Sequence, residues 1–237
     1  MTTTLYRIYS LPEMSGNSQA KLPTLVEHAS RALREMILSG ELKPGERIYP
    51  DSAAERLGMS AIPVREALRS LASAGLIEAA PRHGFRVRPA DREDLLQTYE
   101  LRLLLDPYAA NLAVPRMSRA AIARMNEALQ QLEQTLRSGD MRSYDRDHRS
   151  FHFSIYEHCG SAWLLRFMGM LWENSQRYQR MSAAFRGTTA DRVAEHRAIA
   201  QACEAGDAQG TARLVRQHLE RTREVVLREL DKEASTS

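Results

Sequence analysis

The sequence predicts a mainly α-helical fold, in which an N-terminal winged helix-turn-helix is followed by an all-α helical bundle. Its 237 residues exceed the roughly 100–200 residues of one typical domain, which favours two domains. An aromatic content of 6%, with 12 glycines and 9 prolines, favours helices over β-sandwiches. Apolar residues also recur at helical spacing through most of the chain.

We expect three segments along the chain. Residues 1–20 show no sustained periodicity and are predicted to form a flexible arm. Residues 21–89 are predicted to form the winged module, and residues 90–232 the helical domain. The module contains more Lys and Arg than Asp and Glu, so the net charge of +3 can be placed there, which permits a polyanionic partner.

The winged module begins with two predicted helices. The first covers residues 24–39, where apolar residues recur at helical spacing before Gly40 stops the helix. A turn at residues 43–45 leads to a short helix over residues 51–57, which ends at Gly58.

A third helix follows at once, predicted over residues 61–74. Ser60 is a good N-cap, Pro63 lies in the first turn, where its missing N–H costs little, and Gly75 caps the end. Two short helices around a tight glycine-containing turn form a helix-turn-helix.

The wing is predicted from two strand-like runs, residues 76–79 and 85–88. Between them, Arg82 and His83 precede Gly84, a residue that lets the backbone come close to a ligand. We therefore expect this loop to contact the minor groove or a phosphate.

The second helix of a helix-turn-helix lies in the major groove, so Ser60, Ala61, Ile62 and Arg65 are predicted to face DNA. Arg65 could bind guanine in a bidentate manner or a phosphate. Arg69, one turn later, is better placed for the DNA backbone. The alternative is that both arginines only solvate an exposed helix face.

Several motifs of this module resemble those of one family, the GntR family of bacterial transcription regulators. The resemblance implies that Ser60, Arg65, His83 and Gly84 touch the operator. The motifs occupy residues 33–40, 44–45, 55–58, 63–68, 75–76 and 84.

Three residues, at two places in the module, depart from the family pattern. Ala61 and Ile62 stand where the family commonly has Arg-Thr or Arg-Gly, and Asp51 stands where some members have a DNA-contacting arginine. Ile62 can still contact a thymine methyl group, whereas Asp51 would repel phosphate.

The second domain is helical throughout residues 92–229, and we expect about six helices. Glycines followed by a polar residue separate the predicted helices of this domain. The predicted N-caps are Ser118, Asp140, Ser161, Thr189 and Asp207.

Four histidines of this domain are candidate metal ligands. His148 and His152 are four residues apart on one predicted helix, so both side chains leave the same face. His196 and His218 lie on later helices, and imidazole suits Zn, Ni, Cu or Fe. From spacing alone the alternative stays open, because histidine pairs on helices are often surface or core residues.

The motifs around these histidines resemble the effector domain of the FadR subfamily within the GntR family. The resemblance implies that His148, His152, His196 and His218 surround a divalent metal, zinc first, with nickel, iron or manganese as alternatives. His148 replaces the usual Asp or Asn. The motifs lie at residues 99–102, 106–107, 151–152, 159–160, 195–199 and 218–219.

An all-imidazole site is neutral and leaves the full charge of the metal in place. That charge favours an anionic effector such as a carboxylate, with Arg102 as a second, bidentate anchor. The leading hypothesis is a regulator, acting as a repressor, whose homodimer binds a palindromic operator in double-stranded DNA and senses a small organic acid.

The histidines are compatible with two other functions. The first is a metal-dependent hydrolase, in which zinc is held by His148, His152 and His196 and activates a nucleophilic water. No HExxH motif supports this function. In the second, the metal only ties helices together while another pocket senses the ligand.

Composition also limits the location of the chain. No run approaches the ~20 apolar residues that span a bilayer, and the amino terminus has no signal-peptide pattern, so no membrane partner is expected. Cys159 and Cys203 show no CxxC spacing, which suits a reducing compartment. We therefore expect a cytoplasmic protein.

Overall fold

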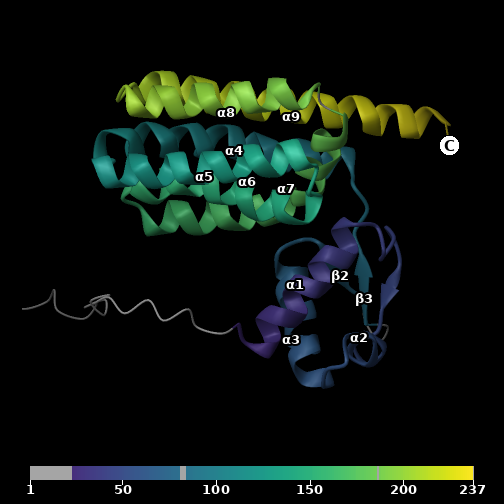
Figure 1. The fold of residues 1–237 in the computed structure, drawn as a ribbon. Helices are drawn as coiled ribbons and strands as arrows, with labels where there is room; N and C mark the ends of the chain where they lie inside the picture. Colours follow the sequence, from purple (N-terminus) through teal and green to yellow (C-terminus); the bar gives the residue numbers. More distant parts are fainter. Residues whose placement is uncertain (1–22, 81–83, 186, 237) are drawn as a thin grey trace, which may run out of the picture.

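The computed structural model describes residues 23–80, 84–185 and 187–236. The predicted arm at residues 1–20 and the wing residues Arg82 and His83 lie outside the described residues. The chain is mainly helical: a small N-terminal domain lies beside one end of a bundle of long helices that run side by side (Figure 1). The predicted fold class is thereby confirmed.

Three helices build the N-terminal domain, close to their predicted positions. Helix α1 (Leu25–Leu38) starts with a capping box, because Thr24 accepts a bond from the amide of Glu27 and the Glu27 side chain accepts one from the amide of Thr24. Helix α2 (Pro50–Leu57) ends at Gly58 in the left-handed conformation, with φ of 63°. Helix α3 (Ala61–Ser73) follows after a tight turn.

A three-stranded antiparallel sheet completes this domain, in the order β1-β3-β2. Strands β2 (Ile77–Ala79) and β3 (Phe85–Val87) are the predicted wing. Strand β1 (Arg47–Ile48) was not predicted, because two residues are too short to show an alternating pattern. It ties the segment before α2 to the wing.

One hydrophobic core holds helices and sheet together. Leu33 of α1, Leu68 and Leu71 of α3, and Ile77 of β2 are almost completely buried. Their burial fixes the helix-turn-helix and the wing as one unit and leaves Ser60 and Ile62, at the amino end of α3, exposed.

The second domain contains the six expected α-helices within the described residues. Ser118, Asp140, Ser161 and Asp207 cap their helices as predicted, whereas the fifth cap is Thr188 rather than Thr189. The elements are α4 (Arg92–Ala113), η1 (Val114–Arg116), α5 (Arg119–Ser138), α6 (Met141–Tyr156), η2 (Glu157–Cys159), α7 (Ala162–Phe185), α8 (Thr189–Glu204) and α9 (Ala208–Thr236).

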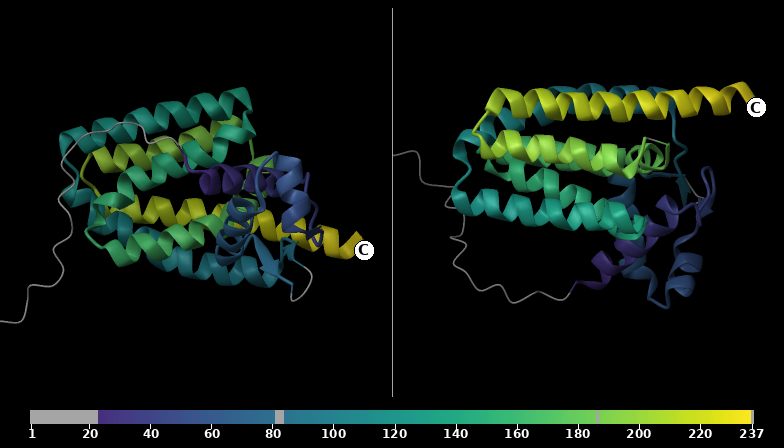
Figure 2. Two further views of the ribbon diagram at one scale, coloured as in Figure 1. Left: turned by 90° about the horizontal axis from the view of Figure 1, so that it is seen from below. Right: turned by 45° about the horizontal axis from the view of Figure 1, so that its top comes forward.

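The core of the bundle lies between all of these helices. Tyr99 of α4, Phe151 and Tyr156 of α6, and Tyr178 of α7 are fully buried in it. Figure 2 shows that α8 and α9 cover one side of the bundle and that the small domain lies against the other. No helix in the described ranges is long and apolar enough to cross a membrane.

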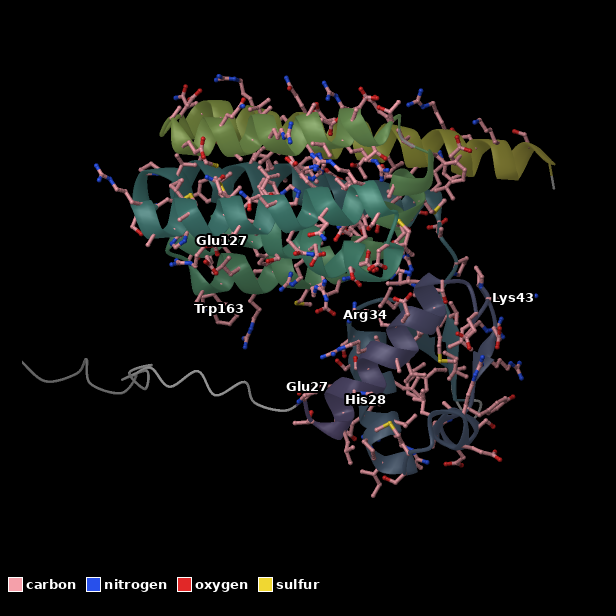
Figure 3. All side chains as sticks on the ribbon, in the orientation of Figure 1. Glu27, His28, Arg34, Lys43, Glu127 and Trp163 are labelled. Carbon is pink, nitrogen blue, oxygen red and sulfur yellow. The ribbon has the colours of Figure 1, made fainter. Side chains whose placement is uncertain are left out.

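Helix α7 joins the two domains. Arg34 of α1 faces the bundle (Figure 3) and donates to Gln176 Oε1 and Glu173 Oε2, each at 2.7 Å. Arg177 donates to the carbonyl oxygen of Gly75 at 3.3 Å. The domain junction is therefore made of polar contacts along one face of α7.

Candidate DNA-reading surface and metal centre

The amino end of α3 presents the predicted DNA-reading residues to solvent. Ser60 is the N-cap residue, yet its hydroxyl makes no capping bond and stays available for another partner. Ile62 is 78% exposed, and Ala61 beside it is half-buried. Single exposed apolar side chains are common on protein surfaces, and the exposure of Ile62 leaves it accessible to a partner at the amino end of α3.

Both candidate arginines on α3 lie near carboxylates. Arg65 Nη2 is 3.6 Å from Asp51 Oδ1, and Arg69 Nη1 is 2.5 Å from Glu66 Oε1. All four side chains are at least half exposed. Exposed ion pairs of this kind contribute only about 0–1 kcal/mol, so a phosphate or a guanine can displace the carboxylate.

Gly84 of the wing has a strict steric requirement. Its φ is +78°, and a Cβ built there would lie 2.5 Å from the carbonyl oxygen of Ile48. Only glycine fits this close approach between the wing and β1. The predicted contacts of Arg82 and His83 fall outside the described residues.

The four candidate histidines come together inside the bundle. His148 and His152 of α6, His196 of α8 and His218 of α9 are all buried, and one ligand nitrogen from each lies within 4.8 Å of the others. The Nε2 atoms of His148 and His152 are 3.1 Å apart, as the four-residue spacing predicts.

Two of the imidazoles are oriented by strong acceptors on their outer nitrogens. His196 Nδ1 is 2.7 Å from the carbonyl oxygen of Arg192, and His218 Nδ1 is 3.0 Å from Glu195 Oε2. These oxygens only accept, so each Nδ1–H donates and the Nε2 lone pair points inward. Outer bonds of this type are typical of histidines that ligate metals.

The other two imidazoles have polar partners as well. His148 Nδ1 is 3.4 Å from Gln179 Oε1, and His152 Nδ1 is 3.4 Å from the hydroxyl of Tyr156. All four Nδ1 atoms therefore face outer partners, while the Nε2 atoms converge.

Burial keeps the pair on α6 neutral. Loss of hydration, followed by repulsion from His196 and His218, holds the pKa of His148 well below its ordinary value. Burial, followed by repulsion from His148, does the same to the pKa of His152. Neutral imidazoles are ready to bind a cation without first losing a proton.

The donor set fits one metal ion. Metal–nitrogen bonds of about 2.1 Å place two ligand nitrogens at most about 4.2 Å apart. The nitrogens of the cluster lie within 4.8 Å of one another, so a small adjustment of the rings closes them on a single ion. Four neutral nitrogens suit zinc and the later first-row metals.

Arg102, the predicted effector anchor, lies deep in the bundle behind Trp172. Its guanidinium donates to Asp106 Oδ2 from Nε at 3.2 Å and from Nη2 at 2.7 Å. Nη1 donates to Ser175 at 2.9 Å, and the ring of Trp172 lies 4.7 Å from Cζ. The side chain is 3% exposed, and its charge is balanced by Asp106.

A chain of hydrogen bonds connects this ion pair to the histidines. Gln179 Nε2 donates to Ser175 Oγ at 2.8 Å, and Gln179 Oε1 lies next to His148 Nδ1. Arg102 donates to the same Ser175 oxygen. Ser175 and Gln179 both belong to α7, the helix that also forms the domain junction.

Sequence reasoning missed the outer partners of the histidines. Glu195 precedes a candidate ligand in the sequence, and that adjacency was the one available signal. Gln179 gave none, because its position next to His148 depends on how α6 and α7 pack. Tyr156 lies four residues after His152 on α6, so helical spacing was a signal that could have found it.

A winged helix-turn-helix joined to a helical domain indicates a class of protein, the DNA-binding transcription regulators. Residues 25–87 match the family described as bacterial regulatory proteins, gntR family, and residues 97–221 match the FCD domain. The chain belongs to the GntR family of DNA-binding transcriptional regulators with an FCD domain.

Individual relatives agree with this assignment. The chain is 32% identical to the HTH-type transcriptional regulator McbR of Escherichia coli over 67% of its own length and 72% of the relative's. It is 26% identical to the E. coli HTH-type transcriptional repressor GlaR, covering 80% and 90% of the two chains. The solved structure of E. coli McbR/YncC superimposes on this chain with a TM-score of 0.75 at 25% sequence identity. The match covers 87% of this chain and 99% of that one.

These families and relatives are regulators and not enzymes. The prediction that the chain is not an enzyme is confirmed, and nothing supports the hydrolase alternative.

Proposed function

We propose that this regulator is a repressor whose homodimer binds a palindromic operator and releases it when a small organic acid enters a metal-containing pocket. The observation that carries the proposal is the convergence of four buried imidazoles whose outer nitrogens all face polar partners. A dimer is supported by the two-fold symmetry that helix-turn-helix operators usually have. Repression is supported by a relative that is named as a repressor.

His148, His152, His196 and His218 would hold the ion, with zinc first and nickel, iron or manganese as alternatives. When bound, the metal supplies a positive, Lewis-acidic centre to which a carboxylate oxygen can bind. Because all four ligands are neutral, they leave the full charge of the ion available for an anion. Glu195 and the Arg192 carbonyl fix two of the rings in the required orientation.

Arg102 is the predicted second anchor for the acid. To bind a ligand carboxylate it must exchange Asp106, whose Oδ2 accepts from both Nε and Nη2 of Arg102. Such an exchange would also disturb the bond to Ser175 and, through Gln179, the orientation of His148.

Helix α7 is the element that would carry this change to DNA. Ser175 contacts Arg102 and Gln179 contacts His148. Gln176 and Arg180, on the same helix, contact α1 of the DNA-binding domain. If α7 shifts when Ser175 and Gln179 change their contacts, Gln176 and Arg180 move with it. The DNA-binding domain, which these two residues contact, is then displaced. Coupling of this kind is reciprocal, so DNA weakens effector binding by the same factor.

The metal centre is tested by elemental analysis and zinc titration of the full-length protein and of His196→Ala. The proposal predicts one metal per chain, a rise in melting temperature with zinc concentration, and loss of both in the variant. Sedimentation with a selected operator should give two chains per duplex. A protein without metal affinity, or one chain per operator, would contradict the proposal.

A further inference from the structure

A small cavity opens beside the histidine cluster, between α6, α7, α8 and α9. Its volume is about 10 Å³, which is room for roughly one water-sized atom. Three of the four candidate ligands border it, together with hydroxyl, amide and guanidinium groups. The lining residues are Tyr144, His148, Gln179, Ser182, Ala183, Arg192, His196, His218 and Thr222.

The lining has an unbalanced charge. Among the described residues that border the cavity, Arg192 carries the one permanent charge and none is acidic. The nearest carboxylate on the cluster, Glu195, accepts bonds from His218 Nδ1 and from Arg221 Nη1, on the outer side. A divalent ion on the imidazoles would add to the positive charge of Arg192, and an anion is the ligand that balances it.

The guanidinium of Arg192 has N–H groups that can donate hydrogen bonds to a ligand. Its Nε is buried and has no hydrogen-bond partner within the described residues, and Nη2 makes only a long 3.4 Å contact with Thr189. A buried donor without a partner is costly, so a site normally provides one. Arg102 differs, because Asp106 and Ser175 already occupy its donors.

We propose that Arg192 is a further anchor, in addition to Arg102, and that it binds a carboxylate ligand in this cavity. The inference rests on the proposed metal centre and names the residue that selects its ligand. One carboxylate oxygen fills the single-atom space next to the Nε2 atoms, and the other accepts from the Arg192 guanidinium. A planar carboxylate suits this narrow space better than a tetrahedral phosphate, whose additional oxygens have no room.

The backbone of Arg192 strengthens the link between ligand and metal. Its carbonyl oxygen orients His196 at 2.7 Å while its side chain borders the cavity. One residue therefore positions a metal ligand and contacts the acid.

The test is calorimetric titration of the zinc-loaded, full-length protein with acetate, acetamide and inorganic phosphate. Acetate should bind, and both other probes should bind more weakly. Arg192→Gln should weaken acetate binding by about tenfold or more, because a charge-assisted hydrogen bond is lost. Arg192→Lys, which keeps the charge, should retain part of the affinity.

Arg213→Gln is the matched control, since Arg213 is an exposed arginine of α9 that lies outside the cavity. It should bind acetate as the wild type does. Zinc affinity, measured by chelator competition, should be the same in all variants, which shows that the metal site is intact.

Three results would each overturn the assignment of Arg192. They are equal acetate affinity in Arg192→Gln and wild type, no acetate binding at all, and tighter binding of acetamide or phosphate than of acetate. Failure of the wild type to bind zinc would instead overturn the metal centre of the proposed function.

Discussion

Arg180 of α7 forms an ion pair with Glu35 of α1 across the domain junction, with Nη2 and Oε2 2.7 Å apart. The same guanidinium donates to Asp145 of α6 from Nε at 2.8 Å. Gln179, the preceding residue, contacts His148. Two consecutive residues of α7 thus touch the histidine cluster and the DNA-binding domain, so the two sites are joined by one rigid helix.

Arg180→Gln should destabilise the protein. The Arg180 side chain is 10% exposed and Asp145 is 11% exposed, so the substitution leaves a buried carboxylate without its cation. We expect the free energy of unfolding to fall by about 3 kcal/mol, measured by urea denaturation. Arg213→Gln, which removes an exposed arginine, should change it by about 0.5 kcal/mol or less. Equal effects of the two variants would show that the buried pair of Arg180 and Asp145 contributes nothing to stability.

Glu195→Gln should weaken zinc binding while leaving all four ligands in place. Glu195 accepts the Nδ1–H of His218, and loss of such an outer carboxylate typically lowers metal affinity by about 10–100-fold. Chelator competition measures the change, with the exposed Glu224→Gln as the control. Unchanged affinity in Glu195→Gln would mean that His218 does not ligate.

Arg65→Ala and Asp51→Asn should shift operator affinity in opposite directions. Removing Arg65 loses a base or phosphate contact of about 1–3 kcal/mol. Removing the charge of Asp51, 3.6 Å from Arg65, frees that arginine and ends the repulsion of phosphate. Fluorescence anisotropy with a selected operator at fixed salt distinguishes them. Loss of affinity in Asp51→Asn would show that the carboxylate holds Arg65 in its reading position.

Gly84→Ala should destabilise the DNA-binding domain more than Gly40→Ala. Both glycines have φ near +79°, at +78° and +79°, but a Cβ at Gly84 meets Ile48 whereas one at Gly40 meets nothing within 4 Å. We expect about 1 kcal/mol from backbone strain at both sites and a further 1–3 kcal/mol from the clash at Gly84. Thermal unfolding measures the stability of both variants. Equal losses of stability would mean that the wing moves aside to accommodate the Cβ at position 84.

Asp94 should contribute stability that disappears in acid. Burial raises the pKa of this carboxyl, but hydrogen bonds from Tyr178 and Arg177 outweigh burial and hold the pKa below its ordinary value. A lowered folded-state pKa stabilises above the unfolded value of about 3.9 and is lost as pH falls through the folded value. Urea unfolding between pH 3 and 7 should show wild type and Asp94→Asn converging at low pH. A constant difference would contradict this.

Features of the fold that depend on residues close together in the sequence could be predicted from the sequence alone. Ser118, Asp140, Ser161 and Asp207 cap their helices because a short polar side chain at a helix start satisfies free amides, whatever the helix packs against. The pairing of His148 with His152 follows from helix geometry in the same way.

Features that depend on tertiary packing could not be predicted. Strand β1 exists because residues 47–48 reach the wing, not because of a pattern in two residues. Gln179 is next to His148, and Glu195 next to His218, because helices converge. Arg192 lies one turn before His196 on α8, but the cavity that its side chain borders is formed by the packing of four helices. The pairing of Arg102 with Asp106 has the four-residue spacing of a helical ion pair, yet its deep burial depends on α7.

Selection of genomic DNA fragments by the purified protein, with and without zinc, tests DNA recognition and its coupling to the metal pocket in one experiment. We expect enrichment of a short palindrome, read by the exposed residues at the amino end of α3. Enrichment should change when zinc and acetate are added together, because the pocket and the DNA-binding domain are coupled through α7. Absence of any enriched sequence at low salt, where phosphate contacts are strongest, would contradict the account.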